Sequence, residues 1–199
     1  MDNSLYQFLF SAFAFVLGAA IGSFLNVCIY RLPRDLSVNQ PRRSFCPSCK
    51  KPIPAHQNLP LISWFLLRGR CANCGTKIAF RYFAVEFLTA LLFLAIWQSF
   101  SWQMAMAYWI FISLVVVATF VDFEHFIIPD QVTIGGTIAG LIASFAVPEL
   151  MNTDSRIAAA VRSLLAAGLG YLILLIVLEA GCYDHVVARQ RAPNCITRM

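Results

Sequence analysis

Two pairs of cysteines are the strongest candidates for chemistry in this 199-residue sequence. They read Cys46-Pro47-Ser48-Cys49 and Cys71-Ala72-Asn73-Cys74, with 21 residues between the pairs. A tight turn of this length aims two thiolates at one ion, and two such turns complete a tetrahedral four-thiolate zinc site. Such a site has no open position, so its role is structural. The spacing therefore predicts that Cys46, Cys49, Cys71 and Cys74 bind Zn²⁺.

Two disulfides, or a redox-active C-x-x-C pair, are the alternative explanations of these cysteines. The loop that carries them is expected to be cytosolic, where thiols stay reduced, and no βαβ pattern surrounds either pair. The loop is also poor in aliphatic residues, so metal binding and folding are expected to be one event. Cys28, Cys182 and Cys195 have no partner at metal-ligand spacing.

Acids at the end of a long apolar run form the second group of candidates. Asp122 directly follows the uncharged run 87–121, and Glu124, His125 and Asp130 lie within the next eight residues. An ionisable group next to hydrocarbon is costly and is a functional candidate, although at a helix end it can reach water. Within this group, Asp122 is our candidate catalytic residue.

Asp122 could supply one carboxyl of an aspartyl protease, but that chemistry needs two. One carboxylate acts as base toward a water while the other, held neutral, polarises the scissile carbonyl. Glu179 and Asp184 are later acids expected on the same side, where either could also be a solvated helix end, and Asp184 is the second candidate. Asp130 is expected to be an N-cap, and Glu86 a first-turn acid favoured by the helix dipole.

Membrane helices must position these groups. The sequence is 59% hydrophobic and 13% charged, whereas soluble domains contain about 25% charged residues. Uncharged runs occupy residues 5–30, 87–121, 131–148 and 163–178. Since a span needs about 20 residues, the second run is divided at a turn near 99–102. The predicted fold is an all-α polytopic membrane protein with about five transmembrane helices; a cleaved signal peptide is the alternative for 5–30.

The positive charge gathers in one loop. Residues 31–81 contain ten of the fifteen basic side chains and one acid, Asp35. Cytoplasmic loops carry such an excess, so the loop is expected to be cytosolic, with the N-terminus outside. The predicted domains are helix one at 5–30, a cytosolic zinc module at 31–81, helices two to five at 82–178, and a divergent tail at 179–199.

Several classes of protein do not fit these patterns. The apolar content excludes a disordered chain, and the long apolar runs between the cysteines exclude a disulfide-stapled secreted module. A transporter is disfavoured because the acids lie at helix ends rather than in mid-membrane. Nucleic acid is not an expected partner, since anionic lipid headgroups explain the basic loop more simply.

Four separated stretches of the sequence together resemble the type IV prepilin peptidases, bifunctional leader peptidases and N-methyltransferases. The resemblance covers about residues 15–178. The matching segments are 18–27 with 30–33; 46–49 with 58–60, 63–64 and 67–71; 81–82 with 85–86 and 89–90; and 122–130.

The resemblance implies a multi-pass aspartyl endopeptidase of the bacterial inner membrane. It would cut the leader from type IV prepilins or type II secretion pseudopilins on the cytosolic side, and then methylate the new N-terminus with S-adenosylmethionine. By the same resemblance Asp122 is one catalytic aspartate, the four cysteines hold zinc, and the cytosolic loop supports methyl transfer. No Gly-rich loop of the dinucleotide type marks the cofactor site.

The sequence departs from the family in one motif. The family's second aspartate lies in Gly-x-Gly-Asp, which is absent here; Asp184 lies 62 residues after Asp122, but Tyr183 replaces the preceding glycine. From Cys182 onward no apolar run is long enough to cross a bilayer, so a truncated C-terminus is expected. The alternative function is a catalytically incomplete family fragment that acts as a membrane-bound zinc interaction module.

Overall fold

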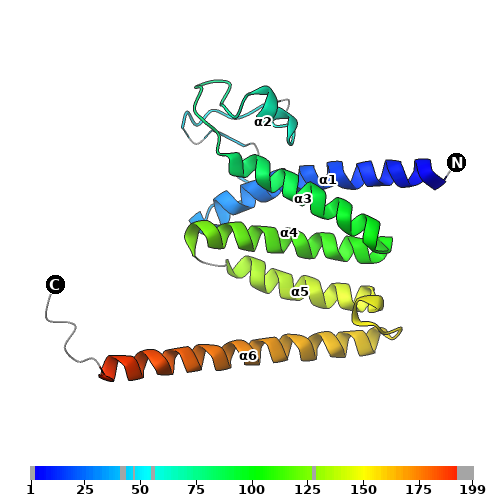
Figure 1. The fold of residues 1–199 in the computed structure, drawn as a ribbon, viewed down its shortest axis with the longest axis vertical. Helices are drawn as coiled ribbons and strands as arrows, with labels where there is room; N and C mark the ends of the chain where they lie inside the picture. The colour runs from blue at the N-terminus through cyan, green and yellow to red at the C-terminus, as the bar shows by residue number, and fades with distance from the viewer. Residues whose placement is uncertain (1–2, 41–43, 47, 55–56, 127–128, 192–199) are drawn as a thin grey trace. The chain divides into compact units, whose positions relative to one another are not determined.

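The computed structural model describes residues 3–40, 44–46, 48–54, 57–126 and 129–191. It divides into two compact units, Met1–Gly140 and Leu141–Met199. In the described residues the extended pairing consists of two isolated bridges, and everything else that is regular is helical (Figure 1). The helices are α1 (Asn3–Arg31), α2 (Ile62–Leu66), α3 (Phe80–Ser99), α4 (Trp102–His125), α5 (Asp130–Ala146) and α6 (Arg156–Arg191), with 3₁₀ turns η1 (Leu32–Arg34) and η3 (Pro148–Met151).

Four of these helices are long and apolar enough to cross a membrane. They are α1, α3, α4 and the part of α6 from Arg156 to Val177. The predicted all-helical, polytopic membrane fold is therefore confirmed. Helix α5 has 17 residues, at the short end of the range of about 17–25 for a span, so the fifth crossing stays a prediction.

The helix boundaries agree with the apolar pattern between α3 and α4, whereas α6 extends beyond its apolar run. The expected division of the long apolar run is confirmed, because α3 ends at Ser99 and α4 begins at Trp102. Helix α6 continues to Arg191, beyond the apolar run 163–178. Hydrophobicity marks only the part of a helix that faces lipid, whereas a helix ends at a capping residue or a helix breaker. The first proline after the apolar run is Pro193, so the sequence offers no proline to end the helix earlier.

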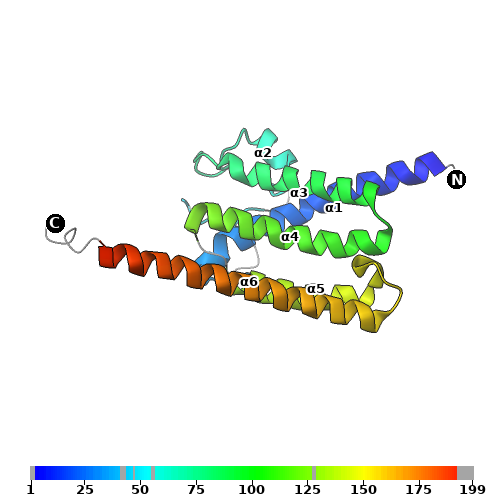
Figure 2. The same cartoon turned by 60° about the horizontal axis from the view of Figure 1, so that its bottom comes forward.

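The first unit is built on α1, α3 and α4, which lie side by side in both views (Figures 1 and 2). One core cluster contains Ile29 of α1, Val85 of α3 and Val121 of α4. A second cluster contains Phe93 and Trp109, whose rings stack with centroids 4.9 Å apart. Buried side chains from all three helices therefore hold the bundle together.

Two glycines set the close approach of α1 to α3. A Cβ added at Gly18 would lie 2.8 Å from the Cα of Ala90, and one added at Gly22 would lie 2.7 Å from the Cα of Glu86. Small residues four positions apart allow such contact between membrane helices, as in the G-x-x-x-G pattern. Asn26, one turn further along α1, is thereby brought against the start of α3.

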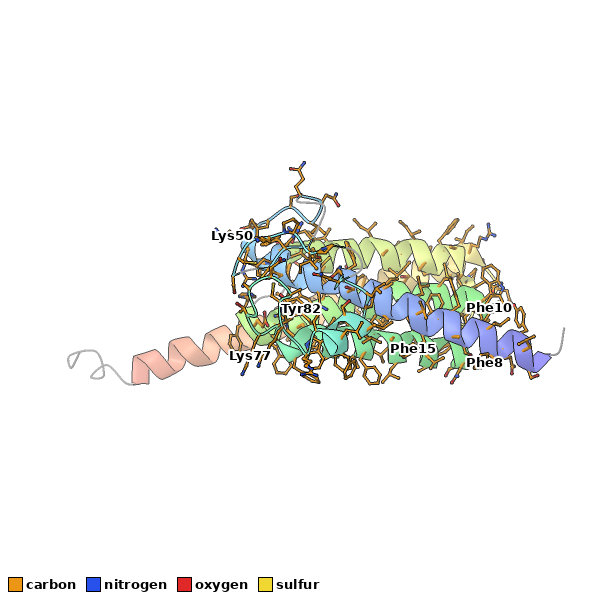
Figure 3. All side chains as sticks on the ribbon, turned by 90° about the horizontal axis from the view of Figure 1, so that it is seen from above. Phe8, Phe10, Phe15, Lys50, Lys77 and Tyr82 are labelled. Carbon is orange, nitrogen blue, oxygen red and sulfur yellow. The ribbon has the colours of Figure 1, made fainter. Side chains whose placement is uncertain are left out.

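The bundle has two different ends. Figure 3 shows Lys50, Lys77 and Tyr82 at one end, and Phe8 and Phe10 toward the other. The end of α1, the four-cysteine module, the start of α3 and the end of α4 meet at the first end. The cysteines and Asp122 therefore lie at the same end of the bundle, while the side of the membrane to which it belongs stays a prediction.

The second unit contains η3 and α6. The Arg162 guanidinium donates hydrogen bonds to the carbonyl oxygens of Met151, at 2.8 Å, and Asn152, at 3.2 Å. These bonds tie the first part of α6 to the turn that precedes it. Leu165 and Leu169 of α6 are exposed, as is expected for a helix that faces lipid.

Candidate metal centre and active site

The two cysteine pairs lie in turns with the same backbone pattern. In each turn the first cysteine makes two backbone hydrogen bonds, with the residues four and five positions later. These bonds, 2.8–3.0 Å long, join Cys46 to Lys50 and Lys51, and Cys71 to Gly75 and Thr76. Lys50 and Gly75 both adopt positive φ, of 57° and 69°. The chain thus forms the same knuckle twice.

The two knuckles bring the four thiols together. All four Sγ atoms lie within 4.8 Å of one another, and those of Cys46 and Cys74 are 3.8 Å apart. A tetrahedral zinc ion with Zn–S bonds near 2.3 Å holds its sulfurs about 3.8 Å apart. The four are free thiols, not disulfides. The convergence predicted from the spacing is confirmed, and the cluster could hold a metal ion.

Hydrogen bonds and burial give the thiols of this cluster different pKa values. The hydroxyl and backbone N–H of Thr76 lower the pKa of Cys74 to about 6. The backbone N–H of Lys51 acts to lower the pKa of Cys49, but burial and the neighbouring thiolates outweigh it and raise this pKa to about 11. Some thiols of the cluster ionise readily and others resist, because a thiol that donates a hydrogen bond to a neighbouring thiolate is held in its neutral form. A bound cation would remove that conflict.

A cavity of about 460 Å³ lies beside the module. Side chains from α1, the module, the start of α3 and the end of α4 line it. Among the residues that the structure describes, four buried polar atoms of the lining have no hydrogen-bond partner: Asn26 Oδ1, Ser63 Oγ, Trp64 Nε1 and Arg81 Nε. Most buried polar atoms in proteins are paired. This set offers both acceptors and donors, so the cavity suits a polar ligand with groups of both kinds.

Two hydrogen bonds lie around this cavity, one between α1 and α3 and one between α3 and the module. The Asn26 amide donates to the backbone oxygen of Tyr82 at 2.9 Å, and the Glu86 carboxylate accepts from the backbone N–H of Leu61 at 2.7 Å. Glu86 lies in the second turn of α3, so the prediction of a first-turn acid is wrong. The spacing of Glu86 and Leu61 gave no signal that they would meet.

The acids at the end of α4 have separate roles. Asp122 is exposed in the last turn of α4, while Glu124 forms an ion pair with Arg81 at the start of α3. Asp130 is the first residue of α5. The backbone carbonyl oxygen of the preceding residue, Pro129, accepts a hydrogen bond from the backbone N–H of Thr133. The N-cap is therefore Pro129, and the prediction that Asp130 caps this helix is wrong by one position.

The two predicted catalytic acids belong to different units. Asp122 lies in the first unit, and Asp184 lies in α6 of the second. The side chains of Asp184 and Glu179 are outside the described residues. The assignment of Asp122 and Asp184 as a catalytic pair stays a prediction.

These features define a multi-pass membrane protein that carries a four-cysteine module after its first helix. Two family models match the chain in succession. Residues 16–100 match the bacterial peptidase A24 N-terminal domain, and residues 109–186 match the type IV leader peptidase family. The chain belongs to the type IV leader peptidase family.

Curated relatives agree with this assignment. The chain is 42% identical over 154 residues to a prepilin leader peptidase/N-methyltransferase of Myxococcus xanthus, an alignment that covers 77% of this chain and 46% of the relative. It is 39% identical to a type 4 prepilin-like proteins leader peptide-processing enzyme of Escherichia coli, covering 67% of this chain and 56% of the relative. The chain spans about half the length of these relatives. No solved structure matches it.

Proposed function

We propose that this chain is a prepilin-processing enzyme of the bacterial inner membrane. It removes the leader of type IV prepilins or pseudopilins as an aspartyl endopeptidase and methylates the new N-terminus with S-adenosylmethionine. The activities for which its relatives are named support this function. The structural observation that carries it is that Asp122 and a cavity lined by several unpaired polar atoms lie at one end of the helix bundle, where the Arg81–Glu124 ion pair joins α3 to α4.

Peptide cleavage is assigned to Asp122 together with a second carboxyl, for which Asp184 is the candidate. One carboxylate takes a proton from water as the water attacks the scissile carbonyl. The other, protonated because two close carboxyls share one proton, donates a hydrogen bond to the carbonyl oxygen. The exposure of Asp122 at the end of α4 agrees with this role, since the peptide must reach it from outside the bundle.

The four cysteines are assigned as ligands of a structural zinc ion. Their number, their all-sulfur chemistry and the 4.8 Å limit on their separations fit a closed tetrahedral site. Such an ion supplies no open position for substrate. Its contribution is to fix the two knuckles, and through them the loop that lines the cavity.

The cavity is assigned as the site of the methyl donor. S-adenosylmethionine carries an α-ammonium and an α-carboxylate, and when bound it supplies an electrophilic methyl group. The Asn26 Oδ1 atom and the half-buried Glu86 carboxylate could accept from the ammonium, while Arg81 Nε and Trp64 Nε1 could donate to the carboxylate. These residues would bind and orient the donor.

Membrane topology follows from the same proposal. The basic loop 31–81 would lie in the cytosol, with Asp122 on the same side and the N-terminus outside. Anionic lipid headgroups would face the basic side chains of the loop. The leader of the substrate, on this assignment, is cut at the cytosolic surface.

Cleavage of a prepilin peptide by the purified 199-residue chain tests the proposal. The peptide carries glycine before the cut and phenylalanine after it, and Asp122→Asn and Asp184→Asn variants are assayed beside the parent chain. We expect the parent chain to cleave the peptide. The cleavage rate should fall by a factor on the order of 10³ or more in each variant, as for residues that act in one catalytic unit.

The other outcomes are equally informative. Full activity of Asp184→Asn would exclude Asp184 and direct the search to Glu179. Absence of cleavage by a well-folded, metal-loaded chain would contradict the peptidase assignment for this chain and favour a membrane-bound zinc interaction module.

A further inference from the structure

The four-cysteine module carries an apolar surface that the described residues of the first unit leave exposed. Helix α2 has five residues and buries Ser63, whereas Ile62, Phe65 and Leu66 are 56%, 62% and 74% exposed. A helix this short is not stable by itself. Large neighbouring apolar side chains exposed in this way mark a site of interaction rather than ordinary surface.

The exposed surface is continuous with a membrane-spanning helix. The Phe83 ring of α3 lies 5.0 Å from that of Phe65 and 5.3 Å from that of Trp64, and it stacks on Phe87 at 5.8 Å. Phe80 and Phe87 are themselves exposed, and α3 is one of the candidate spans. The aromatic row therefore runs from α2 directly onto the lipid-facing side of α3.

The position of α2 along α3 gives the depth of this surface. Helix α2 contacts the first two turns of α3 and does not lie beyond its end (Figures 1 and 2). Phe80 and Phe87 are about 10 Å apart along the helix axis, at 1.5 Å per residue. If α3 spans a bilayer, α2 lies level with the boundary between the acyl chains and the headgroups.

Basic side chains stand next to this apolar face. Arg68 and Arg70 follow α2 and are exposed, as is Lys77 just before α3. Gly69, at φ +63°, lets the chain turn over the Trp64 ring, which its Cβ would approach to 3.1 Å. An apolar face with a basic border is the pattern of a helix that lies in the interface of an anionic membrane.

We infer that α2 is an interfacial anchor that inserts Ile62, Phe65 and Leu66 into the bilayer surface, with Arg68 and Arg70 on anionic headgroups. The anchor holds the four-cysteine module against the membrane, so the cavity between module and helices stays at the bilayer surface. The occupant of the apolar face is lipid. This inference does not depend on the enzymatic activity of the chain.

Site-specific photocrosslinking of the full chain in lipid nanodiscs tests the anchor. A benzoylphenylalanine replaces Phe65 or, in a second variant, Leu66, and a matched control carries it at Lys51, an exposed residue of the first knuckle. With nanodiscs that contain anionic lipid, we expect lipid adducts at positions 65 and 66 in severalfold excess over position 51. Equal lipid labelling at all three positions, or protein adducts at 65 and 66, would overturn the inference.

Trypsin protection is a second measurement that does not depend on the crosslinker. Cleavage after Arg68 and Arg70 should be slow in anionic nanodiscs and severalfold faster in a Phe65→Gln/Leu66→Gln variant that still elutes as a monodisperse protein. Cleavage at the same rate in parent and variant would show that α2 is not seated in the bilayer. A rate unchanged when anionic lipid is replaced by zwitterionic lipid would exclude the headgroup contacts of the two arginines.

Discussion

Arg81, the second residue of α3, forms an ion pair with Glu124, the residue before the last of α4. The pair lies two positions from Asp122 and joins the end of α4 to the wall of the cavity. Arg81 is 18% exposed and Glu124 is 35% exposed. This contact therefore ties the end of α4, which carries the proposed cleavage residue, to the start of α3.

Breaking this ion pair should affect the position of Asp122 more than global stability. For partly exposed pairs the coupling energy is about 0.2–1 kcal/mol, so a double-mutant cycle of Arg81→Gln and Glu124→Gln in mixed micelles should give a value in this range. Cleavage of a prepilin peptide should fall in each single variant. A coupling energy of zero with unchanged cleavage would show that the contact has no role in holding α4.

Gly22 should tolerate no larger residue, because the backbone of α3 occupies the space that a Cβ on Gly22 would need. Gly22→Leu would force the helices apart, and we expect a loss of ~1–3 kcal/mol or more in the free energy of unfolding, typical of overpacking. Gly135→Leu in α5 is the matched control, since no atom of the described residues lies within 4 Å of a Cβ there. Equal stability of the two variants in denaturation from detergent micelles would contradict the close approach.

Loss of one cysteine ligand should unfold the module. Cys71 is buried in the thiol cluster, and a Cys71→Ser variant would leave three ligands for the ion. Because metal binding and folding of such a module are coupled, we expect loss of bound zinc and rapid proteolysis within residues 44–78. Cys28→Ser, in α1 and outside the cluster, is the control for thiol loss. A module that stays resistant to protease without Cys71 would exclude a structural metal site.

The Glu86 carboxylate should hold the chain at Leu61 through one hydrogen bond. Leu61 adopts φ +63°, an unfavourable conformation for this residue, and its N–H donates to Glu86. Glu86→Ala leaves that donor without its partner, which costs about 1–3 kcal/mol, whereas Glu86→Gln retains an acceptor. Amide hydrogen exchange at Leu61 and Ile62 should therefore be faster in the alanine variant than in the glutamine variant. The same exchange in both would show that another group holds the loop.

The sequence was sufficient for the features that depend on local pattern. The spacing within each cysteine pair determines a knuckle, so the thiol cluster could be predicted without knowledge of the fold. The polar residues at 98–99 and 101–103, which interrupt the long apolar run, located the turn between α3 and α4 in the same way. Both signals lie within a few residues of the structure that they determine.

The contacts around the cavity could not be predicted from spacing. Asn26 meets Tyr82 across 56 positions, and Arg81 meets Glu124 across 43. Such contacts depend on how closely α1, α3 and α4 pack. Gly18 and Gly22 control the packing of α1 against α3. The G-x-x-x-G spacing is the sequence signal that could have indicated this approach. The same limit applies to α2, whose exposed face has meaning only once it is seen beside α3.

Removal of the Asn26 side-chain oxygen should weaken binding of the methyl donor and leave peptide cleavage intact. Asn26 Oδ1 is a buried, unpaired acceptor in the cavity, while the Asn26 amide group donates to Tyr82. Asn26→Leu removes this oxygen together with the hydrogen bond to Tyr82, so we expect S-adenosylmethionine binding to weaken by about 10-fold or more. Equilibrium dialysis with the purified chain measures this binding independently of methyl transfer. Asn152→Ala, in the second unit, is the control, and equal affinity of the two variants would place the donor site elsewhere.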